Sequence, residues 1–206
     1  VTYQSTADDT EVERDITISA MDSNGDTGSD TITLKVEQRN NAPTFAGDGT
    51  LAGVNEDTAE PSGTTVGNLF DALFDDPDKS FTPADYLAGI VVTADSSDPD
   101  EGEWQYSTDG SSWHAVGDVS SDNGLLLSRD ASLRFVPTDN YNGTPGGLGV
   151  HAVDSTDGSI TFTDGSSRTS FDTTAVGATG GETAVSAGAV NLNTSILPVD
   201  DAPVLD

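Results

Sequence analysis

The chain has 206 residues, of which 36 are Asp or Glu and only 7 are Lys or Arg, so its formal net charge is −29. Nucleic acids and anionic membrane surfaces repel a protein of that charge, which excludes both as partners. It contains no cysteine and no run approaching the ~20 apolar residues of a membrane-spanning helix, so we expect neither disulfides nor membrane insertion. Two explanations of the acidity stay open: adaptation to a salt-rich habitat, and binding of a hard cation such as calcium.

The apolar and glycine contents predict the fold class. Only 33% of the residues are hydrophobic and 22 are glycine, so the core must be thin and the loops numerous. Short alternating segments separated by turn residues are typical of β-sandwiches. We therefore predict an all-β protein, a β-sandwich with one or two short helices and long loops.

Two alternating segments open the chain. Residues 15–20 and 31–36 alternate apolar and polar side chains, the period of a half-buried strand. Two or three strands cannot bury a core alone. This part of the chain therefore either docks on the rest of it or is the end of a module that starts elsewhere. Between them, Asp22, Asn24 and Asp26 have the alternate spacing of a calcium loop. The loop lacks the Gly and the Glu of an EF-hand, so a solvated polar turn is the alternative.

The remainder of the chain reads as short strands and turns. Trp104, Tyr106 and Trp113 give apolar mass to a hairpin around Asp109-Gly110, a strong turn signal. Residues 155–188 are rich in Ser, Thr, Gly and Asp, so we expect weak strands or a long ordered loop there. The predicted strands cover residues 89–94, 103–107, 112–116, 125–127, 133–137, 148–153 and 190–196, and the predicted helices cover residues 66–74 and 82–88.

Clustered carboxylates suggest metal binding. Asp75, Asp76 and Asp78 follow a predicted helix, and charges so close repel one another unless a cation neutralises them. Calcium is bound by about six to eight oxygen ligands, which such clusters supply together with turn carbonyls. We predict a calcium site there. Asp139 and Asp154 flank a turn-rich stretch and have two interpretations, as calcium ligands or as turn caps.

No catalytic motif is evident, and we predict that the chain is not an enzyme. His114 and His151 lie on separate predicted strands, and neither a G-x-S-x-G nor an HExxH motif is present. With 36 acidic residues, pairs of carboxylates arise by chance and do not indicate a glycosidase.

The large aromatic side chains have two interpretations, an exposed face for sugar stacking or a place in the core. Because the chain has few other large residues, we expect most of this set in the core: Trp104, Tyr106, Trp113 and Tyr141.

Two motifs together resemble one protein family. Residues 133–154, LRFVPTDNYNGTPGGLGVHAVD, are similar to the FxPxxxYNG…D signature of bacterial cadherin-like modules, and residues 104–117 read WQYSTDGSSWHAVG. The combination resembles the peptide-binding domain of calcium-dependent RTX adhesins, which are giant bacterial surface proteins. The resemblance covers residues 55–199.

The resemblance implies a calcium-stabilised, cadherin- or immunoglobulin-like β-sandwich in a secreted, extracellular protein of the bacterial cell surface. It implies cell adhesion, as in biofilms, through calcium-dependent binding of short peptides by their free C-terminus. The implied partners are C-terminal peptides of proteins on another cell surface and neighbouring adhesin modules. A bound calcium with an open coordination position could accept the peptide carboxylate. We expect residues 75–78 and 139–142 to converge on that ion, with a ligand-binding set of Asp139, Asn140, Tyr141 and Asn142.

A repeated linker gives the domain boundaries. Asn40-Asn-Ala-Pro43 recurs in kind as Asp200-Asp-Ala-Pro203, and such linkers lie at interdomain calcium sites in cadherin-like arrays. The resemblance implies further calcium ligands near them, namely Asn41, Asp201, Glu56 and Asp57. It also implies four parts: terminal strands of a preceding or split module (1–39), a linker (40–43), the peptide-binding sandwich (44–199), and a linker that begins another module (200–206).

Two other functions stay open. A carbohydrate-binding module would expose coplanar aromatic side chains. A purely structural, calcium-rigidified extender repeat would bind calcium only at its linkers and would have no ligand pocket.

Overall fold

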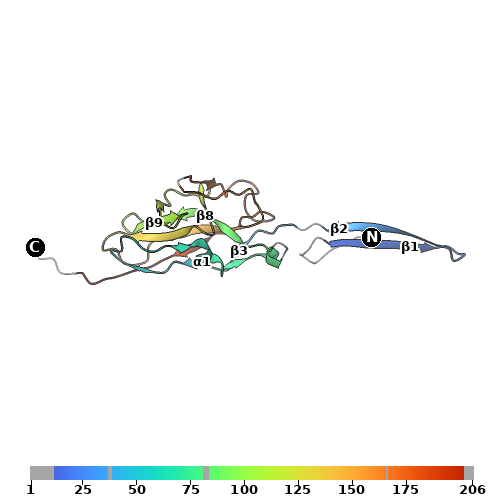
Figure 1. The fold of residues 1–206 in the computed structure, drawn as a ribbon, viewed down its shortest axis with the longest axis horizontal. Helices are drawn as coiled ribbons and strands as arrows, with labels where there is room; N and C mark the ends of the chain where they lie inside the picture. Colours follow the sequence, from blue (N-terminus) through green and yellow to red (C-terminus); the bar gives the residue numbers. More distant parts are fainter. Residues whose placement is uncertain (1–11, 37–38, 81–83, 166, 202–206) are drawn as a thin grey trace, which may run out of the picture.

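The structure, a computed structural model, describes residues 12–36, 39–80, 84–165 and 167–201. These residues form an all-β fold in which two sheets face each other across a core and a separate hairpin lies beyond one end of the long axis (Figure 1). The predicted all-β, sandwich-like fold class is confirmed. No helix among the described residues is both long and apolar enough to cross a membrane.

One face of the sandwich is a four-stranded antiparallel sheet in the order β10–β9–β12–β6. Its strands are β6 (Thr64–Thr65), β9 (Gly102–Ser107), β10 (His114–Ala115) and β12 (Ser132–Pro137). Residues of β9 and β12 pair directly, Trp104 with Phe135 and Tyr106 with Leu133. The two motifs on which the family resemblance depends therefore lie on neighbouring strands.

The other face is a six-stranded sheet in the order β14–β11–β8–β13–β15–β4, antiparallel except for the parallel pair β15–β4. Its strands are β4 (Gly49–Thr50), β8 (Leu87–Asp95), β11 (Gly124–Ser128), β13 (Leu148–Asp154), β14 (Ser170–Phe171) and β15 (Val190–Asn193). Two small pairs complete the sandwich: β3 (Thr44–Phe45) with β7 (Phe74–Asp75), and β5 (Val54–Asn55) with β16 (Ile196–Leu197).

The main core lies between the two sheets. Along β12, Leu133 and Phe135 are buried while Arg134 is only half-buried, as the alternating sequence predicts. The ring of Trp104 meets Phe135 edge to face at 5.2 Å, and its indole N–H donates to the Gly146 carbonyl at 2.9 Å. This packing fixes the turn after β12 against the sheet.

A second, smaller core explains why β8 and β13 are buried on both faces. Val91 of β8 and Val153 of β13 point away from the main core and pack with Leu126 and Val185. Side chains from residues 155–188 cover this group on the outer side of the sheet, Ile160, Phe162 and Phe171. In the part that the structure describes, that segment contains the strand β14 and otherwise turns and loops, as predicted (Figure 1, orange to brown).

The helices differ from the prediction at their ends. Helix α1 covers Val66–Phe70, capped by the Thr65 hydroxyl, which accepts the Asn68 N–H at 3.2 Å. The predicted helix over 66–74 is too long, because Phe74 pairs with Phe45 in the β3–β7 ladder. The predicted helix over 82–88 begins at residues outside the described ones, and its C-terminal end is wrong because β8 starts at Leu87. A 3-10 helix, η1 (Pro77–Ser80), follows β7.

The predicted closing strand over 190–196 is divided between two sheets. Its first part, β15, pairs with β13 and β4, whereas Ile196 belongs to β16 and pairs with Val54 of β5. Two separate parallel ladders therefore attach the last strands of the sandwich to β4 and β5, near its first strands.

The N-terminal hairpin consists of β1 (Val12–Met21) and β2 (Thr27–Val36), with Ile16 opposite Ile32. It does not dock on the sandwich (Figure 1). Ile18 and Ile32 on its apolar face are 54% and 52% exposed. A two-stranded ribbon is at best marginally stable in water, and among the described residues this apolar face stays about half exposed.

Candidate metal site at the N-terminal linker

Four carboxylates are buried together where the chain enters the sandwich. Oxygens of Asp76, Asp78 and Asp85 lie within 4.8 Å of one another, and the three residues are 1%, 0% and 7% exposed. Asp154, 1% exposed at the end of β13, is close enough for its charge to raise the pKa of Asp76. We call these four residues the aspartate cluster.

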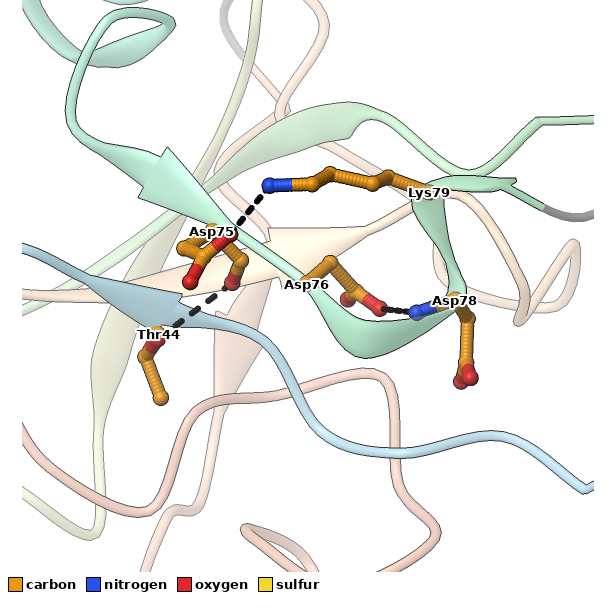
Figure 2. Close-up of polar contacts among 5 residues, drawn as sticks. All are labelled: Thr44, Asp75, Asp76, Asp78 and Lys79. Atoms are coloured by element: carbon orange, nitrogen blue, oxygen red, sulfur yellow. Dashed lines mark hydrogen bonds and ion pairs between the residues drawn. The ribbon is translucent and has the colours of Figure 1, made fainter. Parts of the chain in front are cut away.

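The local fold explains how residues distant in sequence meet there. Neighbouring side chains on a strand point to opposite faces, so Asp75 at the end of β7 points outward and Asp76 inward. The η1 turn brings Asp78 to the same side as Asp76, and the backbone N–H of Asp78 donates to Asp76 Oδ1 at 2.6 Å (Figure 2). Pairing of β8 with β13 places Asp154 opposite Leu87, close to Asp85.

The linker residues bind directly to the cluster. Asn41 donates to the carboxylate of Asp78 twice, from its backbone N–H and from its side-chain amide, the latter at 3.1 Å. The side-chain amide of Asn40 donates to Asp154 Oδ2 at 3.2 Å and to the carbonyl of Thr183 at 3.0 Å. The predicted linker ligand Asn41 and the predicted ligands Asp76, Asp78 and Asp154 are thus brought to one place.

Three oxygens at this site have no hydrogen-bond donor among the described residues. They are buried and belong to the side chains of Asp76 (Oδ2), Asp85 (Oδ2) and Asn40 (Oδ1). A buried oxygen without a donor is costly, because it has lost its hydrogen bonds to water. Asp85 uses its other oxygen to accept the N–H groups of Tyr86 and Ser155, at 2.9 and 3.0 Å.

The electrostatics of the cluster favour a positive charge in it. Burial, followed by repulsion from Asp85, Asp154 and Asp78, raises the pKa of Asp76 to about 6. Burial also raises the pKa of Asp154, against hydrogen bonds from Thr156 and Asn40. None of the ion pairs found among the described residues involves any of the four aspartates.

Asp75 lies outside the cluster, unlike its two predicted partners. Its side chain is 61% exposed and forms an ion pair with Lys79, one turn further on (Figure 2). That pairing lowers the pKa of Asp75, the opposite of the shift at Asp76. The hydroxyl of Thr44 donates to the backbone carbonyl of Asp75 at 3.3 Å, and this hydrogen bond joins β3 to β7.

A second group of predicted residues gathers at the far end of the sandwich. Glu56, 5% exposed, accepts the side-chain amide of Asn142 at 2.9 Å and the N–H of Val199 at 2.6 Å. Asp57 accepts the N–H of Asn140 at 2.8 Å, and both residues have positive φ angles, 63° and 62°. Carboxylates here are satisfied by N–H groups of the protein.

The expected convergence of residues 75–78 and 139–142 on one ion is wrong. The hydroxyl of Tyr141 donates to Glu101 at 3.1 Å, near the start of β13. Asp154, at the other end of β13, belongs to the aspartate cluster. The seven residues of β13 separate the two places by about 20 Å. Asp139 is exposed in its turn, and Asp201 is exposed where the described chain ends.

The loop of the hairpin is hydrogen-bonded as a polar turn. Asp22 Oδ1 accepts the backbone N–H groups of Asn24 and Asp26, at 2.8 and 2.9 Å. This is the local pattern by which Asp caps a tight turn.

The four aromatic side chains of the predicted set do not form an exposed platform. Trp104 and Tyr106 are 0% and 4% exposed, so the prediction that most of the set lies in the core is confirmed for them. Trp113 is half-buried and has the guanidinium of Arg134 over its ring at 4.1 Å. His151 is buried on β13 and donates from Nδ1 to the carbonyl of Ser186 at 2.9 Å.

Sequence reasoning missed two members of the site, Asp85 and Asn40. Asp85 falls in the first turn of the helix that the sequence predicts over 82–88, whereas in the structure it lies two residues before the start of β8. Asn40 precedes Asn41 in the repeated linker, and that pairing was the available signal.

Comparisons with protein-family models, with curated proteins and with solved structures found no match to this chain.

Proposed function

We propose that this chain is a calcium-binding, ligand-binding module of a secreted bacterial surface adhesin. The observation that carries the proposal is the aspartate cluster, four buried carboxylates packed against a linker. Calcium would offset much of the negative charge of the cluster and would hold the linker against the sandwich.

The donor set fits calcium better than other common metals. It consists of oxygens alone: four carboxylates and the unpaired amide oxygen of Asn40. Calcium accepts such an irregular all-oxygen cage, whereas magnesium keeps several of its waters and zinc prefers nitrogen and sulfur. Unpaired buried carboxylates cost several kcal/mol each, so the cation would also stabilise the fold.

Calcium at this position would act on the linker. Asn40 and Asn41 reach the cluster through hydrogen bonds to Asp154 and Asp78. A cation that fixes these two carboxylates fixes the linker residues that bind them. The neighbouring adhesin module would then keep a set direction relative to the sandwich.

Peptide binding is the second part of the proposal. The resemblance to adhesin peptide-binding domains supports it, and the pairing of β9 with β12 brings the two motifs of that resemblance side by side in one sheet. The ligands would be short peptides with a free C-terminus on another cell. The burial of Trp104 and Tyr106 and the cover over Trp113 count against the alternative of a carbohydrate-binding module.

Calorimetry of paired peptides tests the ligand. We expect peptides with a free C-terminal carboxylate to bind at micromolar affinity, about −8 kcal/mol, in calcium. Binding should be lost with EGTA and with amidation of the same peptide. Equal affinities of the acid and the amide would reject recognition of the carboxylate. Calcium binding without any peptide binding would leave a structural extender repeat.

A further inference from the structure

A cavity of about 650 Å³ lies beside the aspartate cluster, under the segment 155–188. Its wall contains apolar side chains from the second core, Ile160, Phe171 and Val185, together with Ala178 and Ala184. Long loops carried by a rigid scaffold are common places for ligand binding. Its volume falls in the range of cavities that hold small ligands or side chains.

The charged side chains on the wall of the cavity are all acidic. Asp157 and Asp172 each use one oxygen to accept the N–H of a residue two positions on, at 2.9 and 2.8 Å, which leaves the other oxygen for a ligand. Hydroxyl hydrogen bonds from Ser159 and Thr174, followed by these N–H bonds, lower the pKa of both groups, so they stay ionised in mildly acidic conditions. The third, Glu182, pairs with Arg39 at 2.7 Å. The apolar wall with two available carboxylates is complementary to an apolar group beside a positive charge.

The cavity is connected to the aspartate cluster through two residues. Asn40 lies on its wall and donates to both Asp154 and the carbonyl of Thr183, another wall residue. Thr156, also on the wall, donates its backbone N–H to Asp154 Oδ1 at 2.9 Å. A cation in the cluster would fix Asp154 and therefore the positions of Asn40 and Thr156.

We propose that this cavity takes an apolar side chain of a peptide that carries a basic side chain next to it, and that calcium shapes the cavity through Asn40 and Thr156. This proposal rests on the proposed peptide-binding function and deepens it. It gives a reason for calcium dependence in which the ion does not touch the peptide. The buried cluster suits that role, because its aspartates are at most 7% exposed.

Three Gly-Ser hexapeptides with free C-termini provide the test, ending in Leu-Lys, Leu-Glu or Ser-Lys. We expect the Leu-Lys peptide to bind in calcium and the other two to bind at least tenfold more weakly. Ala175→Trp, at an exposed residue on the rim of the cavity, should weaken binding of the Leu-Lys peptide at least tenfold. The matched control is Ala59→Trp, also at an exposed alanine but outside the wall of the cavity, and it should change nothing. Melting curves establish that both variants fold.

Each outcome separates the cavity from the proposed function. If wild type binds the three peptides equally, or if Ala175→Trp binds like Ala59→Trp, the cavity is not the site and peptide binding stands. If wild type binds none of the three at millimolar concentration but binds other free-acid peptides, the assigned ligand chemistry is overturned. If no free-acid peptide binds at all, both proposals fail.

Discussion

The backbone N–H and the side-chain amide of Asn41 both donate to the carboxylate of Asp78, 37 residues further along the chain. Asp78 is fully buried, so this contact joins the linker to the interior of the sandwich and not to its surface. Hydrogen bonds to a buried carboxylate are worth about 1.5–3 kcal/mol each. The linker is therefore an integral part of the aspartate cluster.

Removing calcium should destabilise the protein. An ion that binds only the folded chain stabilises it by about 2.7 kcal/mol when its free concentration is 100 times its dissociation constant. We expect EGTA to lower the melting temperature and calcium to restore it, with little recovery in magnesium. If EGTA leaves the melting curve unchanged at moderate salt, salt adaptation and not calcium binding would explain the acidic composition of the chain.

Asp76→Asn should change stability in opposite directions with and without calcium. In EGTA the substitution removes one of four buried like charges, and the amide oxygen can still accept the Asp78 N–H. We expect a higher melting temperature than that of wild type. In saturating calcium the variant has lost a calcium ligand, and we expect a lower melting temperature than that of wild type. The same sign in both conditions would contradict a cation-balanced cluster.

The calcium-free protein should become more stable as the pH falls from 7.5 to 5. The folded-state pKa of Asp76, about 6, lies above its ordinary value of 3.8, so the folded chain takes up a proton before the unfolded chain does. The destabilisation by this group at neutral pH is on the order of 3 kcal/mol; roughly half of it is lost by pH 5 and the rest only below the ordinary pKa of 3.8. Denaturant unfolding in EGTA measures it. With calcium bound we expect the opposite trend, since protons compete for the ligands.

The linker contact can be measured with trypsin. Arg39 directly precedes Asn40, and the chain has only 7 Lys and Arg in all, so the cleavage products are few. We expect calcium to slow cleavage after Arg39, and Asn41→Ala to restore rapid cleavage in calcium. Cleavage after Lys35, in the hairpin, serves as the control and should not depend on calcium. Equal rates at Arg39 with EGTA and with calcium would mean that the ion does not hold the linker.

Local pattern was enough to predict much of the fold. The alternation of Leu133 and Phe135 with Arg134 predicted both the strand β12 and its buried face. The end of α1 was not predictable in this way, because Phe74 leaves the helical pattern only through its pairing with Phe45, 29 residues earlier. The division of residues 190–196 between two sheets also depends on distant partners.

The site was predicted in part for the same reason. Spacing in the sequence identified Asp75, Asp76 and Asp78 but could not decide which of them points inward, a choice that the β3–β7 pairing makes. Asp85 and Asp154 come together only through the register of β8 and β13. Clusters built across strands leave little local signal, whereas the linker motif leaves a visible one.

Calorimetric titration of calcium into chelator-stripped protein tests the aspartate cluster most directly, with the neighbours Asp75→Asn and Asp76→Asn compared. Asp75 is exposed and paired with Lys79, whereas Asp76 is buried in the cluster, so the two variants differ in position and not in chemistry. We expect Asp75→Asn to bind calcium like wild type and Asp76→Asn to lose one site or to bind there at least tenfold more weakly. Identical titrations for the two variants, or no heat of binding in wild type, would contradict a calcium site in the aspartate cluster.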